Sequence, residues 1–228
     1  MPSSVVFSRP RQLALALDHA ENYAREDFLS GPCNEAAFVL VDCWPDWPAN
    51  AVALIGPEGA GKTHLATMWA AAAGARVVSA RTLSESGLPS ALATGALVVE
   101  DAAAAAEERT LFHLLNLARE ERAFLLLTAR TAPSAWPYVI PDLVSRLRAL
   151  PVATLEAPDD AMLRAVVVKL AADRQLVLDE SVVGYLSTRI ERSFAAARTA
   201  MIALDNEALR QGRPATRALA AELFRDEG

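Results

Sequence analysis

Several residue types are scarce in this chain, and each scarcity excludes a class of protein. Two of the 228 residues are cysteines, and Cys33 and Cys43 lack the paired spacing of a zinc site. So few cysteines are typical of a reducing compartment, which predicts a cytoplasmic protein. No apolar run approaches the ~18 residues that a membrane-spanning helix needs, so no membrane association is expected.

Positive charge is also in short supply. The chain has 22 lysines and arginines against 28 aspartates and glutamates, which gives a net charge of −6. Because strong nucleic-acid binders rely on surplus positive charge, no strong direct DNA binding is expected. Hydrophobic residues, in contrast, make up 53% of the chain and supply enough apolar surface for a large core.

The most informative feature that is present is a phosphate-binding signature. Residues 56–63 read GPEGAGKT, which fits the P-loop pattern G-x-x-x-x-G-K-[ST]. The apolar run Ala51–Ile55 before it predicts a buried strand, and His64–Ala73 after it predicts a helix. In such a loop backbone N–H groups surround the phosphates, Lys62 reaches the β- and γ-phosphates, and the Thr63 hydroxyl ligates Mg²⁺. The predicted nucleotide-binding residues are Gly56, Pro57, Glu58, Gly59, Ala60, Gly61, Lys62, Thr63 and His64.

Short apolar segments alternate with helical patterns over residues 34–155. This alternation predicts an α/β fold, in which a parallel sheet is flanked by helices on both faces. Helices are predicted over Asn34–Asp42, with Asn34 as its cap, and over Glu107–Glu121. The predicted strands are Ala51–Ile55, Arg76–Ser79, Ala96–Val99, Phe124–Thr128 and Val152–Leu155.

From Pro158 onward the pattern is helical only. The breaks between the predicted helices are short, as antiparallel helical bundles prefer. The predicted helices are Asp159–Arg174, Glu180–Glu191, Ser193–Gln211 and Thr216–Phe224. We therefore predict three parts, namely an N-terminal tail at 1–21, an α/β nucleotide-binding domain at 22–156 and a small all-helical lid domain at 157–228.

Two acidic residues follow the third predicted strand. Strand ends form the ligand crevice in parallel sheets, so Glu100 is a candidate Mg²⁺ ligand and Asp101 a candidate catalytic group that orients water. The plain alternative is a strand that ends in solvated charge. Such pairs commonly begin with aspartate, whereas this one begins with glutamate. The exchange predicts intact nucleotide binding with slow hydrolysis.

Arginines at two further places have open roles. Arg146 and Arg148 follow the fourth strand, where they are either surface charges or an arginine finger that reaches a neighbour's γ-phosphate. Arg192 either forms a salt bridge at a helix end or reaches back to the phosphates. Their spacing alone does not separate these interpretations.

Taken together, these segments resemble the AAA+ ATPase domain of the bacterial replication initiator DnaA. Residues 25–34 (REDFLSGPCN) are similar to the segment that lines the nucleotide base in that family. Asp142–Leu147 is similar to the arginine-finger segment, which implies that Arg146 is a catalytic residue acting in trans. Arg192 matches the lid arginine called sensor 2. The resemblance implies a P-loop AAA+ fold that binds ATP or ADP with Mg²⁺.

Within this family the chain is most similar to regulators of the Hda type, which inactivate DnaA. The segment QLALAL resembles their clamp-binding peptide, in which Gln12 binds a pocket rim while Leu13, Leu15 and Leu17 fill apolar subsites. The chain ends soon after the predicted lid, where DnaA carries a DNA-binding domain. The resemblance implies two partners, DnaA and the sliding clamp (β subunit) of DNA polymerase III, and leaves a homodimer open.

The segment after the fourth predicted strand departs from the family. The sensor 1 position falls in residues 128–130, where Ala129 cannot orient a water molecule and Arg130 is an unusual residue. This departure predicts weak intrinsic ATP hydrolysis, which suits a regulator of another protein's ATP. The competing interpretations are a stand-alone AAA+ ATPase, such as a helicase loader or transposition helper, and a small-molecule P-loop kinase. A kinase does not explain the helical lid.

Overall fold

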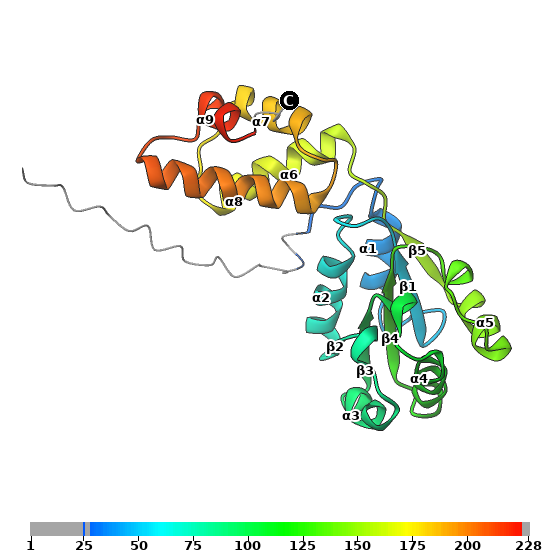
Figure 1. The fold of residues 1–228 in the computed structure, drawn as a ribbon. Helices are drawn as coiled ribbons and strands as arrows, with labels where there is room; N and C mark the ends of the chain where they lie inside the picture. The colour runs from blue at the N-terminus through cyan, green and yellow to red at the C-terminus, as the bar shows by residue number, and fades with distance from the viewer. Residues whose placement is uncertain (1–24, 26–27, 225–228) are drawn as a thin grey trace, which may run out of the picture.

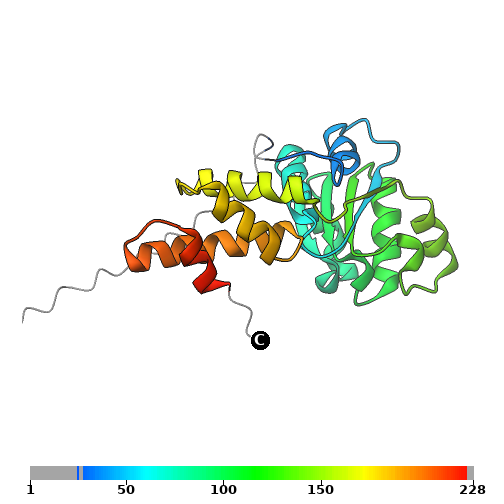
Figure 2. The same cartoon turned by 90° about the horizontal axis from the view of Figure 1, so that it is seen from above.

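A computed structural model describes Arg25 and residues 28–224 of the chain (Figure 1). These residues form a sheet flanked by helices, followed by a group of helices that lies to one side of the sheet (Figure 2). The clamp-binding peptide predicted at Gln12–Leu17 lies outside the described residues.

The sheet has five parallel strands in the order β2-β3-β4-β1-β5. The strand β4 therefore lies between β3 and β1. Because the strands are parallel, their carboxyl ends meet at one edge, where ligands bind in folds of this kind. The strands are β1 (Ala51–Ile55), β2 (Arg76–Ser79), β3 (Ala96–Glu100), β4 (Phe124–Ala129) and β5 (Val152–Thr154).

Each face of the sheet has its own buried cluster, because successive residues of a strand point to opposite faces. Ala51 and Ala53 of β1 belong to the cluster that is completed by α3, α4 and α5. Val52 and Leu54 belong to the opposite cluster, which is completed by α1 and α2. The helices are α1 (Glu35–Asp42), α2 (Lys62–Ala73), α3 (Leu88–Leu92), α4 (Glu108–Glu120) and α5 (Pro141–Arg148). Short 3₁₀ helices are η2 (Ala80–Thr82), η3 (Glu85–Gly87), η4 (Ala102–Ala104) and η5 (Pro133–Ala135).

Aromatic side chains gather on the face covered by α1 and α2. The rings of Trp47 and Trp69 stack with their centroids 4.9 Å apart, and Trp44 meets Trp69 edge-on at 6.4 Å. Phe124, the first residue of β4, contacts both Trp44 and Trp47 edge-on. Edge-on and stacked pairs of this kind stabilise a core beyond the area that they bury. The cluster therefore fixes α2, the helix that begins at the P-loop, against the sheet.

The C-terminal helices form a separate buried cluster. Each begins with a side-chain cap, since the side chains of Asp159, Asp179, Ser193 and Thr216 accept a backbone N–H from the first turn. Among the described residues, no helix is both long and apolar enough to cross a lipid bilayer. The helices are α6 (Asp160–Asp173), α7 (Glu180–Arg189), α8 (Phe194–Gln211) and α9 (Arg217–Leu223).

The predicted parallel α/β sheet followed by helices is confirmed, with local differences. The strands β3 and β4 each run one residue further than predicted, β5 ends one residue earlier, and the helices α3 and α5 were not predicted. Asn34 precedes α1 but makes no side-chain cap. Its Oδ1 instead accepts the Gly31 N–H at 2.8 Å, and its Nδ2 donates to the Leu29 carbonyl at 3.0 Å. The amide therefore closes the loop before the helix.

Candidate nucleotide-binding site

The P-loop lies between β1 and α2 at the carboxyl edge of the sheet, and its backbone requires glycine. Gly59 has φ +73°, and a Cβ there would lie 2.7 Å from the Ser193 Cβ of the C-terminal helices. A Cβ at Gly56 would lie 2.3 Å from the Leu155 carbonyl oxygen. The loop is also tied to α8, because the Phe194 N–H donates to the Gly59 carbonyl at 2.9 Å. These contacts preserve the tight turn that exposes backbone N–H groups to phosphate.

Lys62 folds back over this loop. Its Nζ donates to the carbonyl oxygens of Gly56 at 2.8 Å and Pro57 at 2.7 Å. Burial and the neighbouring Arg130 guanidinium lower the pKa of Lys62, while the carboxylates of Asp101 and Glu58 act in the opposite direction. The ammonium group thus lies above the loop, where it could exchange carbonyl oxygens for phosphate oxygens.

The residues predicted to hold Mg²⁺ lie side by side. The Thr63 hydroxyl donates to the Glu100 carboxylate at 3.1 Å, which joins the start of α2 to the end of β3. Asp101 follows with left-handed backbone angles, φ 52° and ψ 45°. Its N–H donates to the Thr128 hydroxyl at 3.3 Å, so the turn is bound to β4. Among the described residues, no group of three or more His, Cys, Asp or Glu side chains could hold a metal ion. A cation here would need phosphate oxygens to complete its ligands.

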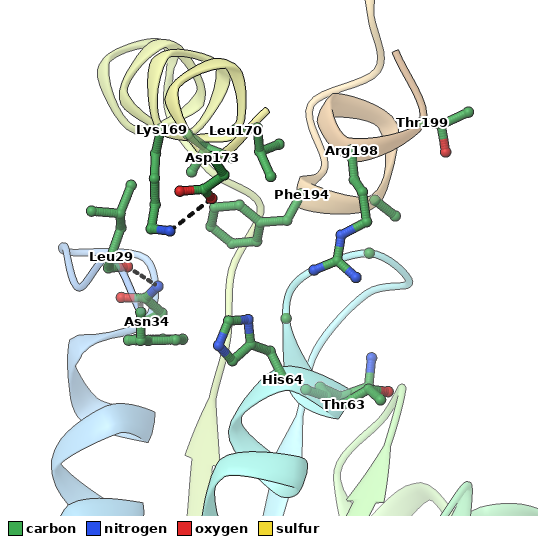
Figure 3. A pocket seen from close by; sticks show the side chains of 16 residues that line it. Leu29, Asn34, Thr63, His64, Lys169, Leu170, Asp173, Phe194, Arg198 and Thr199 are labelled. Atoms are coloured by element: carbon green, nitrogen blue, oxygen red, sulfur yellow. Dashed lines mark hydrogen bonds and ion pairs between the residues drawn. The ribbon is translucent and has the colours of Figure 1, made fainter. Parts of the chain in front are cut away.

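A cavity of about 400 Å³ opens above the P-loop, between α2 and the helices α6 and α8 (Figure 3). Its volume lies within the range of small-molecule sites. Phe28 provides one wall, where its ring stacks on Phe38 at 5.2 Å and meets His64 edge-on at 5.3 Å. Phe194 and Leu170 project into the cavity from the opposite side (Figure 3). The cavity therefore has the P-loop as its floor and the aromatic side chains of Phe28 and Phe194 in its walls.

The arginine that lines the cavity is Arg198, whereas the arginine predicted from the sequence is Arg192. Arg192 precedes α8 and forms an exposed ion pair with Asp160 at 2.8 Å. Arg198, on the second turn of α8, lines the cavity, and its guanidinium points toward the P-loop helix (Figure 3). The signal that could have found it is helical spacing, since Arg198 lies four residues after the cavity residue Phe194 and shares its helix face.

Arg146 belongs to α5 and is not among the residues that line the cavity. In Figure 1, α5 lies on the opposite side of the sheet from the C-terminal helices. The guanidinium carbon of Arg146 lies 5.5 Å from the centroid of the Phe112 ring on α4. The carboxylate of Glu108, also on α4, accepts the N–H groups of Val139 and Ile140 just before α5. Two contacts with α4 thus hold this helix and its arginine in place.

The end of β4 lies between the P-loop and the acidic turn. Ala129 is buried, and its carbonyl accepts the Gly56 N–H at 3.2 Å. Arg130 follows, and its guanidinium forms an ion pair with Glu58 of the P-loop at 2.6 Å. The sequence shows that Arg130 is unusual but does not predict this pair, because the strand order brings the two residues together.

Comparisons with known proteins agree with this architecture. No protein-family model matches the chain, and no curated protein matches it by sequence. Among solved structures, domain III of the Thermotoga maritima replication initiation protein DnaA aligns with a TM-score of 0.75 and 21% identity, over 90% of this chain and 96% of that one. This chain therefore has the same fold as that DnaA domain.

Two further structures are similar. The AMPPCP-bound DnaA from Aquifex aeolicus aligns with a TM-score of 0.66 and 23% identity, over 83% of this chain and 67% of that one. A mutant form of Thermotoga maritima RuvB aligns with a TM-score of 0.70 and 16% identity, over 89% of this chain and 72% of that one. The predicted fold class, a parallel sheet flanked by helices and followed by a helical group, is therefore confirmed, and at identities this low the likeness concerns the fold alone.

Proposed function

We propose that this DnaA-like AAA+ domain binds ATP or ADP in the cavity between its sheet and its C-terminal helices. The observation that carries the proposal is a glycine-dependent P-loop with Lys62 lying over it and an aromatic slot above it. Thr63 and Glu100 are the residues that would hold Mg²⁺, which would neutralise phosphate charge when bound. The likeness to an AMPPCP-bound DnaA supports an adenine nucleotide.

Replacing Lys62 with alanine should weaken ADP binding by about 1.5–3 kcal/mol, because one charge-assisted contact to phosphate is lost. Isothermal calorimetry of the parent and the variant measures this loss. Arg119→Ala, which removes an exposed cation of α4, is the control and should bind ADP like the parent. Unchanged affinity in the Lys62 variant would rule out the P-loop as the nucleotide site.

The two lid arginines can be separated by a matched pair of variants. Arg198→Ala should weaken AMPPCP binding about ten-fold or more, because its guanidinium lines the cavity. Arg192→Ala should change the affinity by less than about two-fold, because this side chain is exposed and paired with Asp160. Calorimetry with AMPPCP ranks the two variants. If Arg192→Ala weakens AMPPCP binding more than Arg198→Ala does, Arg192 makes the phosphate contact, as predicted from the sequence.

We further propose that the protein is a regulator that promotes hydrolysis of DnaA-bound ATP while tethered to the sliding clamp. The placement of Arg146 supports a role in trans, since it lies on α5, away from the chain's own cavity. The tether is the predicted peptide Gln12–Leu17. The decisive assay measures ATP consumption by DnaA in the presence of DNA-loaded clamp, with and without this protein.

A second candidate is a stand-alone ATPase of the motor type. The observation in its favour is that the chain's own site holds an acidic pair, Glu100 and Asp101, and a lid cation, Arg198. Arg130, the residue after β4, argues against rapid hydrolysis. An arginine side chain only donates hydrogen bonds and cannot accept one from an attacking water. Steady turnover of the isolated protein near ~1 s⁻¹ or faster, within the ordinary enzyme range, would favour the motor.

A further inference from the structure

The helix that carries Arg146 has few buried contacts of its own. The helix α5 has 8 residues, and its buried residues are Leu143 and Leu147. Its N-cap residue, Ile140, makes no side-chain cap. A helix this short is only marginally stable by itself. Neighbouring segments must therefore fix the position of α5.

The first fixing contact comes from Glu108, in the first turn of α4. Its Oε2 accepts the N–H of Val139 at 2.7 Å and the N–H of Ile140 at 3.2 Å. Glu108 is half-buried, and a carboxylate forms stronger hydrogen bonds with backbone N–H groups than a neutral acceptor does. The two bonds fix the backbone immediately before Pro141, the first residue of α5.

The same face of α4 also contacts the last turn of α5. Phe112 follows Glu108 by four residues, so both side chains lie on one face of their helix. The guanidinium carbon of Arg146, in the last turn of α5, lies 5.5 Å from the centroid of the Phe112 ring. One face of α4 thus contacts the segment before α5 and the end of α5.

A second fixing contact ties the approach to α5 to the acidic turn. The Tyr138 hydroxyl donates to the Ala102 carbonyl at 2.5 Å and accepts the Ala105 N–H at 3.1 Å. Both partners belong to the segment that joins Asp101 to α4. Burial raises the pKa of Tyr138, so the phenol keeps its proton and remains a donor. The ring also meets Trp136 edge-on at 6.2 Å, a contact that does not need the hydroxyl.

We propose that Glu108 and Tyr138 are positioning residues that hold Arg146 where it can act in trans, an inference that rests on the proposed function. A misplacement of about 1 Å can lower the rate of a reaction about 100-fold. Because the side chain of Arg146 is long and flexible, the backbone that carries it must be fixed. Glu108 and Tyr138 fix that backbone by hydrogen bonds, and neither residue lines the chain's own cavity.

The test measures the hydrolysis of DnaA-bound ATP with DNA-loaded clamp over a range of concentrations of this protein. Glu108→Ala should lower the maximal stimulated rate about ten-fold or more, and Tyr138→Phe about three-fold or more, because Arg146 loses its placement. The concentration that gives half of the maximal rate should change by less than about two-fold, since positioning affects the reaction and not the association. Glu108→Gln should stay within about two-fold of the parent's rate, because its amide oxygen can still accept both N–H groups.

Glu107→Ala is the matched control. Glu107 directly precedes Glu108, is exposed and makes no side-chain cap, so the loss of this carboxylate should leave the stimulated rate unchanged. The affinity for ADP should match that of the parent in every variant, because none of these side chains lines the cavity. Should Glu108→Ala lose its thermal transition, Tyr138→Phe, which keeps the ring, decides the test.

A double variant separates positioning from a direct role. In Glu108→Ala/Arg146→Ala the rate should equal that of Arg146→Ala alone, because Glu108 acts through Arg146. A further loss in the double variant overturns the positioning role. So does a Glu108→Gln variant as slow as Glu108→Ala, or a Tyr138→Phe variant that stimulates like the parent. A parent that does not stimulate hydrolysis overturns the proposed function together with this inference.

Discussion

Under the proposed function, replacing Arg146 with alanine should abolish most of the stimulated hydrolysis of DnaA-bound ATP. An arginine finger neutralises the charge that develops on the transferred phosphoryl group, and its loss lowers the rate by about 10³–10⁵-fold. Folding and nucleotide binding should be preserved, because Arg146 is only half-buried and does not line the cavity. The measurement is ATP consumption by DnaA with DNA-loaded clamp.

Arg148→Ala is the matched control for this prediction. Arg148 lies on the same last turn of α5 and is exposed, whereas Arg146 is the arginine that contacts the Phe112 ring. The loss of Arg148 should matter much less. If Arg146→Ala stimulates hydrolysis as well as the parent does, the trans-acting group is another residue or the proposed activity is wrong.

Replacing Leu15 and Leu17 with alanine should abolish the proposed binding to the sliding clamp. Each leucine should contribute about 1.5–3 kcal/mol if it becomes fully buried in an apolar subsite of the clamp. The double variant should therefore lose most of its affinity in a pull-down with purified clamp. Its thermal unfolding should match that of the parent, because the peptide lies outside the predicted sheet.

The alanines between these leucines supply the control. Ala14→Ser leaves all three leucine anchors in place and should retain clamp binding. A double leucine variant that binds clamp like the parent, or that loses its thermal transition, would show that the peptide belongs to the fold instead. Nucleotide binding should be the same in all of these variants, which separates the tether from the P-loop.

The sheet could be predicted from the sequence because its strands carry a strong local signal. Most are short apolar runs, such as Ala51–Ile55 and Ala96–Val99, and the P-loop fixes which of them precedes the candidate nucleotide site. The helix α5 was harder to predict. It is short, it starts at Pro141, and its two buried leucines, Leu143 and Leu147, give too brief a period to separate a helix from a loop.

The nucleotide site could be predicted only in part. The P-loop and the pairing of Thr63 with Glu100 follow from a motif and from the position of a strand end. The placement of Arg198 in the cavity does not, because it depends on which face of α8 meets the P-loop. Sequence matching selects Arg192 near the start of that helix, whereas the packing of Phe194 against the P-loop turns Arg198 into the cavity.

The ion pair of Glu58 with Arg130 lies beyond the reach of sequence reasoning. The two residues are separated along the chain by three strands and several helices, and each is an ordinary exposed charge. They meet because β4 is inserted between β3 and β1 in the sheet. Strand order is a long-range property that local periodicity does not encode.

The aromatic cluster beneath α2 has a spectroscopic consequence. All four tryptophans of the chain, at positions 44, 47, 69 and 136, belong to the sheet and its covering segments, so the C-terminal helices contain none. Tryptophan fluorescence therefore observes only the part of the molecule that holds the P-loop. Circular dichroism at helical wavelengths observes both parts, and a difference between the two unfolding midpoints would measure how independently the C-terminal helices melt.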